Sequence, residues 1–173
     1  LHGSSAASDV YKRQAIQNLN VTFALDRSGL VGEDGPTHSG NYDIAYLRCI
    51  PNMIVTTPSN EVETRLLLTS AFNFDGPATV RYPRGSGPNK TFEESLNEIP
   101  IGKANFIREG DKKSIMLNFG ALLHEAEKVA ESLNLTLIDM RFVKPLDEDI
   151  LKNHLKRADL VAVSYTHLRA HET

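Results

Sequence analysis

The sequence predicts an α/β fold in which parallel or mixed β-sheets are covered by helices. Short β-type runs such as VTFAL (21–25), MIVTT (53–57) and PATVRY (77–82) alternate with helical segments. This alternation is typical of parallel sheets, because neighbouring parallel strands need a long crossover, usually a helix. A stretch with three prolines and two glycines, PRGSGPNKTFEESLNEIP (83–100), divides the pattern in two and is expected to be a linker.

In the first half, VTFAL is predicted to be a buried strand that ends at Asp26. YDIAYLRCI (42–50) is predicted to form a helix that Pro51 stops, and MIVTT is the next strand. Ser59 or Asn60 can cap the helix EVETRLLLTSAF, and PATVRY follows as the third strand. The apolar stripe expected on that helix consists of Val62, Leu66 and Leu67.

The second half continues the alternation. ANFI (104–107) and SIMLNF (114–119) are predicted strands, and the polar segment between them suggests a hairpin-type turn. The elements expected after them are a helix at about 121–133, the strand LTLIDM (135–140), a short helix near 147–157 and the strand LVAV (160–163).

These patterns divide the chain into a first domain at 15–82, a linker at 83–101 and a second domain at 102–164. The ends, 1–14 and 165–173, differ in composition from the middle and hold His2, His167 and His171, three of the six histidines. We expect both tails to be non-native and to lie outside the fold. On this interpretation the chain is an internal piece of a longer protein.

The composition excludes some classes of protein. A net charge of -3 gives no electrostatic reason to expect nucleic acid or an anionic membrane as a partner. A single cysteine, Cys49, cannot form an internal disulfide, which favours an intracellular protein, most simply a bacterial cytoplasmic one. No apolar run approaches the roughly 20 residues needed to span a bilayer.

Two arginines follow the ends of predicted strands, where open parallel sheets bind ligands. Arg27 comes two residues after VTFAL, and Arg84 comes two after PATVRY. Guanidinium groups are fixed donors suited to phosphate or carboxylate, so the two can form an anion site. The alternative is an ordinary surface ion pair of each arginine with a nearby acid, Asp26 or Asp75.

The loop DRSGLVGEDGPTHSG (26–40) is longer than a chain reversal needs. It contains Glu33, Asp34 and His38. His38 can move protons near neutral pH, and an acid can orient it or hold a substrate hydroxyl. The alternative is that these side chains only satisfy backbone groups of the loop.

A resemblance to a known family rests on a set of segments in a fixed order. These are DRSGLVGEDGPTHSG, YLRCIPNM, TPSN, RYPRG, IGKA, LNFG and DMRFVKPLDE, within about residues 16 to 163. They resemble the 1-deoxy-D-xylulose-5-phosphate synthases, transketolase-like thiamine diphosphate enzymes. The resemblance implies the later part of a pyrimidine-binding domain followed by the start of a transketolase C-terminal-type domain.

Enzymes of that family condense pyruvate with D-glyceraldehyde 3-phosphate and release CO₂, using thiamine diphosphate and Mg²⁺. Their product is a precursor of isoprenoids, thiamine and pyridoxal, and they work as homodimers. The resemblance implies that Arg27 and Arg84 bind the substrate phosphate. It also implies that Asp34 and His38 lie near the reacting groups as catalytic residues, holding hydroxyls or moving protons.

The family's metal motif, GDG followed by an asparagine, and its cofactor-activating glutamate have no counterpart in this sequence. We therefore expect no cofactor-binding or metal-binding residue here, and an inactive piece of an active parent enzyme. Two alternatives within the superfamily are a transketolase and the beta subunit of a 2-oxo acid dehydrogenase. A third alternative is a non-catalytic α/β interaction domain whose loop is only structural.

Overall fold

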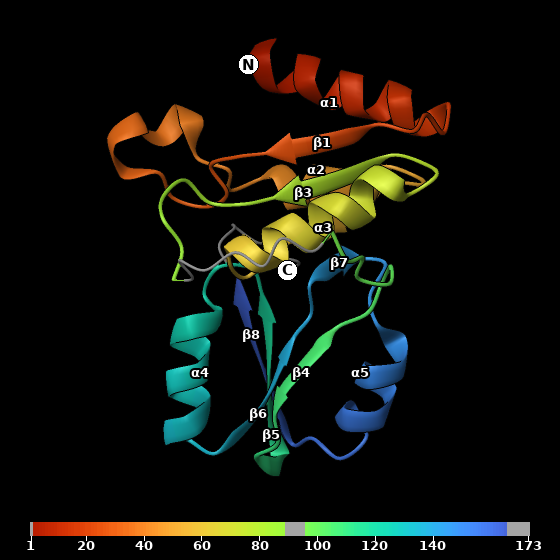
Figure 1. The fold of residues 1–173 in the computed structure, drawn as a ribbon. Coiled ribbons are helices and arrows are strands. Elements are labelled where there is room, and N and C mark those ends of the chain that lie inside the picture. The colour runs from red at the N-terminus through yellow and green to blue at the C-terminus, as the bar shows by residue number, and fades with distance from the viewer. Residues whose placement is uncertain (1, 89–95, 166–173) are drawn as a thin grey trace.

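The computed structural model describes residues 2–88 and 96–165, which form two four-stranded sheets covered by helices (Figure 1). The predicted α/β class with parallel and mixed sheets is confirmed. No helix within these described residues is long and apolar enough to cross a membrane.

The first sheet has the strand order β1-β3-β2-β7. Strands β1 (Thr22–Leu25), β3 (Ala78–Arg81) and β2 (Ile54–Thr56) run parallel, while β7 (Phe142–Lys144) pairs with β2 in the antiparallel direction. Helices α1 (His2–Ile16) and α2 (Asp43–Cys49) cover one face of this sheet, and α3 (Glu61–Asn73) covers the other. The three predicted strands and the helix that ends before Pro51 are therefore confirmed.

The start of α3 resolves one open alternative. Asn60 is the cap, because its side-chain oxygen accepts a hydrogen bond from the Glu63 backbone N–H at 2.9 Å. The buried face of α3 is rotated from the expected stripe, since Val62 and Leu66 are only partly buried. The buried positions, which follow helical spacing, are Glu63, Leu67, Ser70 and Ala71.

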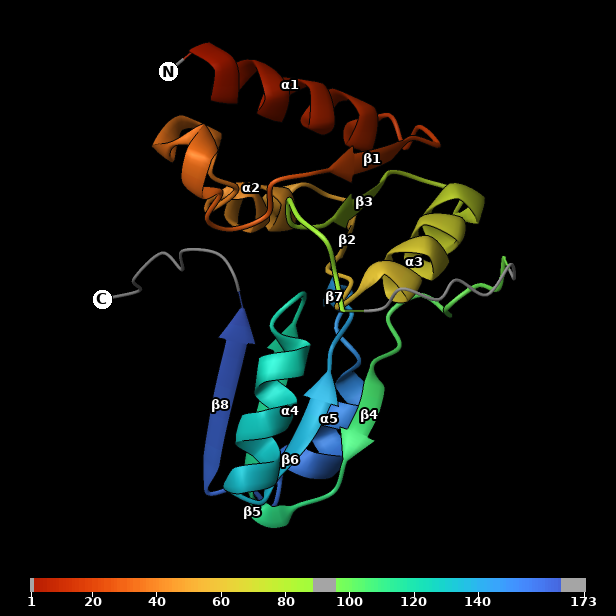
Figure 2. The same ribbon diagram turned by 60° about the vertical axis from the view of Figure 1, so that its left-hand side comes forward.

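The second sheet has the order β4-β6-β5-β8. Its strands are β4 (Asn105–Arg108), β5 (Asp111–Phe119), β6 (Leu135–Asp139) and β8 (Leu160–Tyr165). Helices α4 (Leu123–Ser132) and α5 (Glu148–Leu155) lie on opposite faces of this sheet (Figure 2). Every strand and helix predicted in this half is present.

The predicted hairpin between the first two strands of this half is wrong. β4 and β5 do not pair, because β6 lies between them, antiparallel to β4 and parallel to β5. Leu137 and Ile138 of β6 point to opposite faces and are both completely buried. A strand that is apolar on both faces is most stable at the centre of a sheet that helices cover on both sides.

Strand β7 was not predicted, and it returns the chain to the first sheet. Phe142 and Val143 belong to the hydrophobic clusters on opposite faces of that sheet. The expected division at 83–101 assigns these residues to the second domain. The structure places them in the first sheet, so that the two halves share a strand.

The tails also differ from expectation. Residues 1–14 were expected to lie outside the fold, but α1 packs on the first sheet. The Tyr11 ring lies 4.7 Å from the Phe23 ring, centroid to centroid, and Ala15 is completely buried, so apolar contact explains the packing. At the other end β8 reaches Tyr165. His167, His171 and the side chain of His2 fall outside the described residues.

Candidate functional site

The long loop between β1 and α2 leaves the carboxyl edge of the first sheet. It contains two short 3-10 helices, Gly32–Asp34 and Pro36–His38, joined at Gly35. Gly35 has a φ of 75°, in the left-handed region that favours glycine, so the chain can change direction between the two helices. This arrangement turns Asp34 back toward Arg27 at the base of the loop.

Backbone hydrogen bonds join the ends of β1 and β3 beyond the strands themselves. The Tyr82 N–H donates to the Leu25 carbonyl at 2.9 Å, and the Ser28 N–H donates to the Tyr82 carbonyl at 3.0 Å. The segment that leads to Arg84 therefore runs beside the segment that contains Arg27. This is why two arginines far apart in sequence reach the same place.

Asp34 lies between these two arginines. Its Oδ2 accepts a hydrogen bond from Nε of Arg27 at 2.9 Å, and its Oδ1 forms an ion pair with Nη1 of Arg84. Arg27 also pairs with Asp26. The Asp34 side chain is 21% exposed, whereas those of Arg27 and Arg84 are 36% and 49% exposed. Both arginines can therefore reach solvent while the carboxylate holds them together.

The charges of this cluster shift its proton affinities. The hydrogen bond from Arg84, followed by that from Arg27, lowers the pKa of Asp34 below its ordinary value. In the same way Asp34 and Asp26 raise the pKa of Arg27. Asp34 is thus a carboxylate throughout the neutral range, able to accept hydrogen bonds but not to give up a proton.

His38 is exposed, and its Nδ1 lies 3.1 Å from the backbone oxygen of Asp34 and 3.1 Å from Oγ1 of Thr37. A carbonyl oxygen only accepts hydrogen bonds. A neutral ring that donates from Nδ1 to this carbonyl has its lone pair on Nε2, which is then available to take up a proton. The loop backbone thereby orients the ring.

The structure brings Arg27, Arg84 and Asp34 into one cluster, and His38 contacts the backbone oxygen of Asp34 beside it. The catalytic and binding roles of all four stay predictions. The alternative of a surface ion pair with a nearby acid holds for Arg27, which pairs with Asp26 as well as with Asp34. Arg84 pairs with Asp34, rather than with Asp75. Glu33 lies on the exposed side of the first 3-10 helix, away from this contact set.

Arg81 and Asp43, which were not among the predicted site residues, form a buried ion pair beneath the loop. Nε of Arg81 donates to Oδ2 of Asp43 at 2.5 Å, and the Arg81 side chain is only 1% exposed. The signal was available in PATVRY, because a charged residue within an apolar strand is seldom fully buried without a partner. The partner itself could not be named from the sequence, since it is 38 residues away.

Arg84 also borders a cavity of about 1040 Å³ between α3 and the segment after β3. Arg27, Asp34 and His38 do not line this cavity, so the cluster lies at its margin. Other polar residues in its wall include Ser59, Asn60 and Arg65. The space beside Arg84 is thus large enough for a small phosphorylated molecule.

The described residues do not fit a divalent metal site. They contain no group of three or more histidine, cysteine, aspartate or glutamate side chains placed to hold a metal ion. The acids nearest the cluster, Asp26 and Asp34, already pair with arginines.

Two domain models match the chain in succession. Residues 5–90 match the transketolase pyrimidine-binding domain, and residues 102–170 match the transketolase C-terminal domain. The chain belongs to the transketolase family. The candidate cluster lies within the residues that match the pyrimidine-binding domain.

Among curated relatives, proteins named 1-deoxy-D-xylulose-5-phosphate synthase are similar to this transketolase-family chain. The one from Ectopseudomonas mendocina is 60% identical over 138 residues, which are 80% of this chain and 22% of that protein. The one from Hahella chejuensis is 54% identical over 147 residues, 85% of this chain and 23% of that protein. The chain thus spans less than a quarter of the length of these relatives.

Solved transketolase structures share the fold. A protein described as a split gene transketolase, inactive beta4 tetramer, has a TM-score of 0.82 and 25% identity, covering 95% of this chain and 54% of its own. The transketolase of Campylobacter jejuni has a TM-score of 0.72 and 21% identity, covering 96% of this chain and 27% of its own. The arrangement of both sheets is therefore that of known transketolases.

Proposed function

We propose that this chain is part of a 1-deoxy-D-xylulose-5-phosphate synthase. The parent enzyme condenses pyruvate with D-glyceraldehyde 3-phosphate, releases CO₂ and joins the remaining two-carbon unit to the aldehyde carbon. Thiamine diphosphate, with Mg²⁺, supplies the electron sink for decarboxylation and is bound by other parts of the parent homodimer. The similarity to several enzymes of that name at 54–60% identity supports this proposal.

The observation that best supports the site is the contact of Asp34 with both Arg27 and Arg84. Two guanidinium groups held at one point form a receptor for a doubly charged phosphate. Binding the phosphate end fixes the position of the aldehyde at the other end of the acceptor, which favours bond formation. The chain therefore contributes the acceptor side of the active site.

The loop gives the other two residues distinct roles. Asp34, with its lowered pKa, stays ionised and accepts hydrogen bonds from acceptor hydroxyls. His38, oriented through Nδ1, can take up a proton at Nε2 and then donate it to the acceptor aldehyde oxygen as that oxygen becomes a hydroxyl. Neither role requires a metal ion in this segment.

The experiment replaces one segment of a complete relative. In the Pseudomonas aeruginosa synthase, the matching segment is replaced by residues 16–163 of this chain. The two proteins are 59% identical over 138 residues. The purified chimera is supplied with pyruvate, D-glyceraldehyde 3-phosphate, thiamine diphosphate and Mg²⁺. We expect CO₂ and 1-deoxy-D-xylulose 5-phosphate to form in equal amounts.

Other outcomes identify the alternatives. Two-carbon transfer from a ketose phosphate without CO₂ release would favour a transketolase. CO₂ release with acyl transfer to a lipoyl group would favour a 2-oxo acid dehydrogenase. A folded chimera that binds thiamine diphosphate but forms no product would contradict the proposed function and favour an interaction domain.

A further inference from the structure

The base of the 26–40 loop is closed at Gly40. The Gly40 N–H lies 3.0 Å from the carbonyl oxygens of both Arg27 and Gly29, and its own carbonyl accepts from the Gly29 N–H at 3.2 Å. A Cβ at position 40 would overlap the Arg27 carbonyl oxygen, so only glycine allows this approach. The backbone position of Arg27 is therefore tied to the position of Gly40.

The buried Arg81 side chain binds the backbone of Gly40 at the base of the loop. Its Nη2 donates to the Gly40 carbonyl at 2.5 Å, while its Nε donates to Oδ2 of Asp43 at 2.5 Å. Asp43 is the first residue of α2 and is 8% exposed. One guanidinium group thus fixes the end of the loop and the start of the helix that follows it.

Arg81 also lies in the strand that leads directly to Arg84. It is the last residue of β3 and pairs in register with Leu25, the last residue of β1. The Arg81–Asp43 pair therefore joins the segment that contains Arg84 to the loop that contains Arg27. A buried ion pair is seldom a net source of stability, because both charges lose water, but its geometry is directional.

We propose that Arg81 and Asp43 are positioning residues that set the spacing between Arg27 and Arg84, and thereby the selectivity for a phosphorylated acceptor. This inference rests on the proposed function of the parent enzyme. Both side chains are buried, at 1% and 10% exposure, so we expect neither to contact the substrate. They act through Gly40 on the placement of Arg27, and a small misplacement of a binding group can cost as much as about 100-fold in rate.

The test uses Asp43→Asn in the full-length chimera. The amide keeps the size of the carboxylate but loses its charge, so Arg81 loses its charged partner and is held less strongly against α2. We expect the KM for D-glyceraldehyde 3-phosphate to rise about tenfold and the KM for pyruvate to stay within about twofold. An unchanged acceptor KM would overturn the inference.

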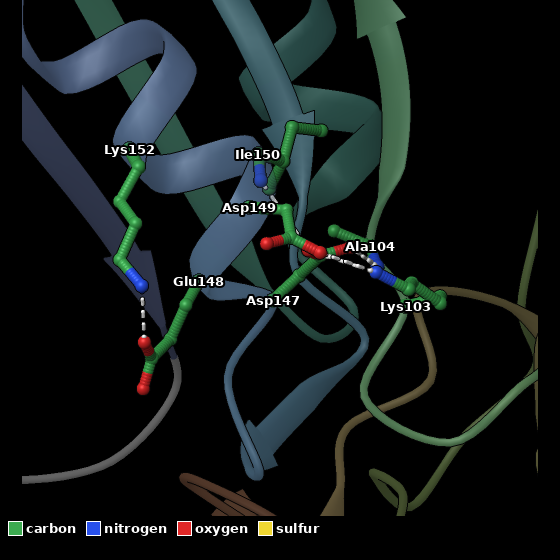
Figure 3. Close-up of polar contacts among 7 residues, drawn as sticks. All are labelled: Lys103, Ala104, Asp147, Glu148, Asp149, Ile150 and Lys152. Atoms are coloured by element: carbon green, nitrogen blue, oxygen red, sulfur yellow. Dashed lines mark hydrogen bonds and ion pairs between the residues drawn. The ribbon is translucent and has the colours of Figure 1, made fainter.

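Asp147→Asn is the matched control (Figure 3). Asp147 is also a buried carboxylate, at 7% exposure, but it lies in the second sheet's half of the chain. It caps α5 by accepting from the Ile150 N–H at 3.3 Å, and it also accepts from the Ala104 N–H at 3.1 Å and pairs with Lys103. This variant should lower the melting temperature and leave both KM values unchanged.

A double variant separates positioning from general loss of structure. If Asp43 acts through Arg27, adding Asp43→Asn to Arg27→Ala should raise the acceptor KM little beyond Arg27→Ala alone. A double variant whose increase in acceptor KM equals the product of the two single increases would contradict the inference. If Arg27→Ala alone leaves the acceptor KM unchanged, the proposed function of the cluster fails instead.

Arg81→Lys keeps the inference testable if Asp43→Asn does not fold. Lysine retains a buried positive charge beside Asp43, but a single ammonium cannot reproduce the two-pronged contact with Asp43 and Gly40. The acceptor KM should again rise selectively. A folded Arg81→Lys enzyme with an unchanged acceptor KM would overturn the inference.

Discussion

Arg141 donates hydrogen bonds from Nε and Nη2 to the two carboxylate oxygens of Glu63, at 2.8 and 2.6 Å, across 78 residues of sequence. Glu63 lies in the first turn of α3, and Arg141 stands between β6 and β7. The side chains are 12% and 16% exposed. This two-pronged pair therefore joins the two halves of the chain where little water can compete.

Glu63→Gln should destabilise the chain through loss of this joint. The arginine would remain largely buried without a charged partner, at a cost of about 2 kcal/mol, between the values typical of exposed and buried pairs. Urea unfolding followed by circular dichroism measures the change. Glu125→Gln, which removes an exposed pair with Lys128 on α4, is the control and should leave the unfolding midpoint unchanged.

Asp139 should make stability depend on pH. Burial raises its pKa from 3.8 to about 6, and its Oδ2 has no hydrogen-bond partner among the residues that the structure describes. The folded chain therefore holds a proton that the unfolded chain releases between about pH 4 and pH 6. Stability from this group falls as the pH rises through that window and is constant above it.

Asp139→Asn should flatten this dependence, because an amide stays neutral at every pH. Urea midpoints of the parent chain and the variant, measured from about pH 4.5 to 7, give the comparison. The difference in urea midpoint between the parent chain and Asp139→Asn should change most below about pH 6. Parallel curves over the whole range would contradict the assignment of the slope to Asp139.

Arg27→Ala and Arg84→Ala should weaken acceptor use in the complete chimera. Each removes one charged donor from the proposed phosphate site, so the acceptor KM should rise at least about tenfold while the pyruvate KM changes little. Arg48→Ala, at an exposed position of α2, is the matched control. Equal effects on both substrates would refute the assignment of the phosphate site.

Gly40→Ala should disturb the same property through the backbone. The added methyl group would overlap the Arg27 carbonyl, which cannot rotate away as a flexible side chain can. We expect a higher acceptor KM and a lower melting temperature. Ser39→Ala adds no volume at the neighbouring position and should change neither, as steady-state kinetics and calorimetry would show.

Local pattern was sufficient for most elements and for the identity of the clustered residues. Arg27 and Arg84 were found because they follow strands, and Asp34 and His38 because their loop is long and polar. Arg81 and Asp43 were missed because they pair across 38 residues and only the folded sheet brings them together. The same holds for the partner of Arg84, which is Asp34 rather than the nearer Asp75.

Strand β7 could not be predicted for a similar reason. Three residues, Phe142–Lys144, are too few to display a period, and Arg141 before them has a φ of 56°, which interrupts the extended pattern. The pairing partner of β7 is β2, far earlier in the chain. The strand order of the second sheet was not predicted either. β6 lies at its centre because helices cover both faces of the sheet there, and not because of which strands precede or follow it in the sequence.

The pairing of β7 with the first sheet means that the two halves of the chain would stay in contact even if the linker between them were cut. A protease cut between 83 and 101 would break the backbone, but β7, Phe142 and the Arg141–Glu63 pair would still bind the two pieces to each other. A first piece expressed alone would leave an edge of β2 and an apolar patch without their cover. The two halves are thus joined by non-covalent contacts as well as by the backbone, and they are not independent modules.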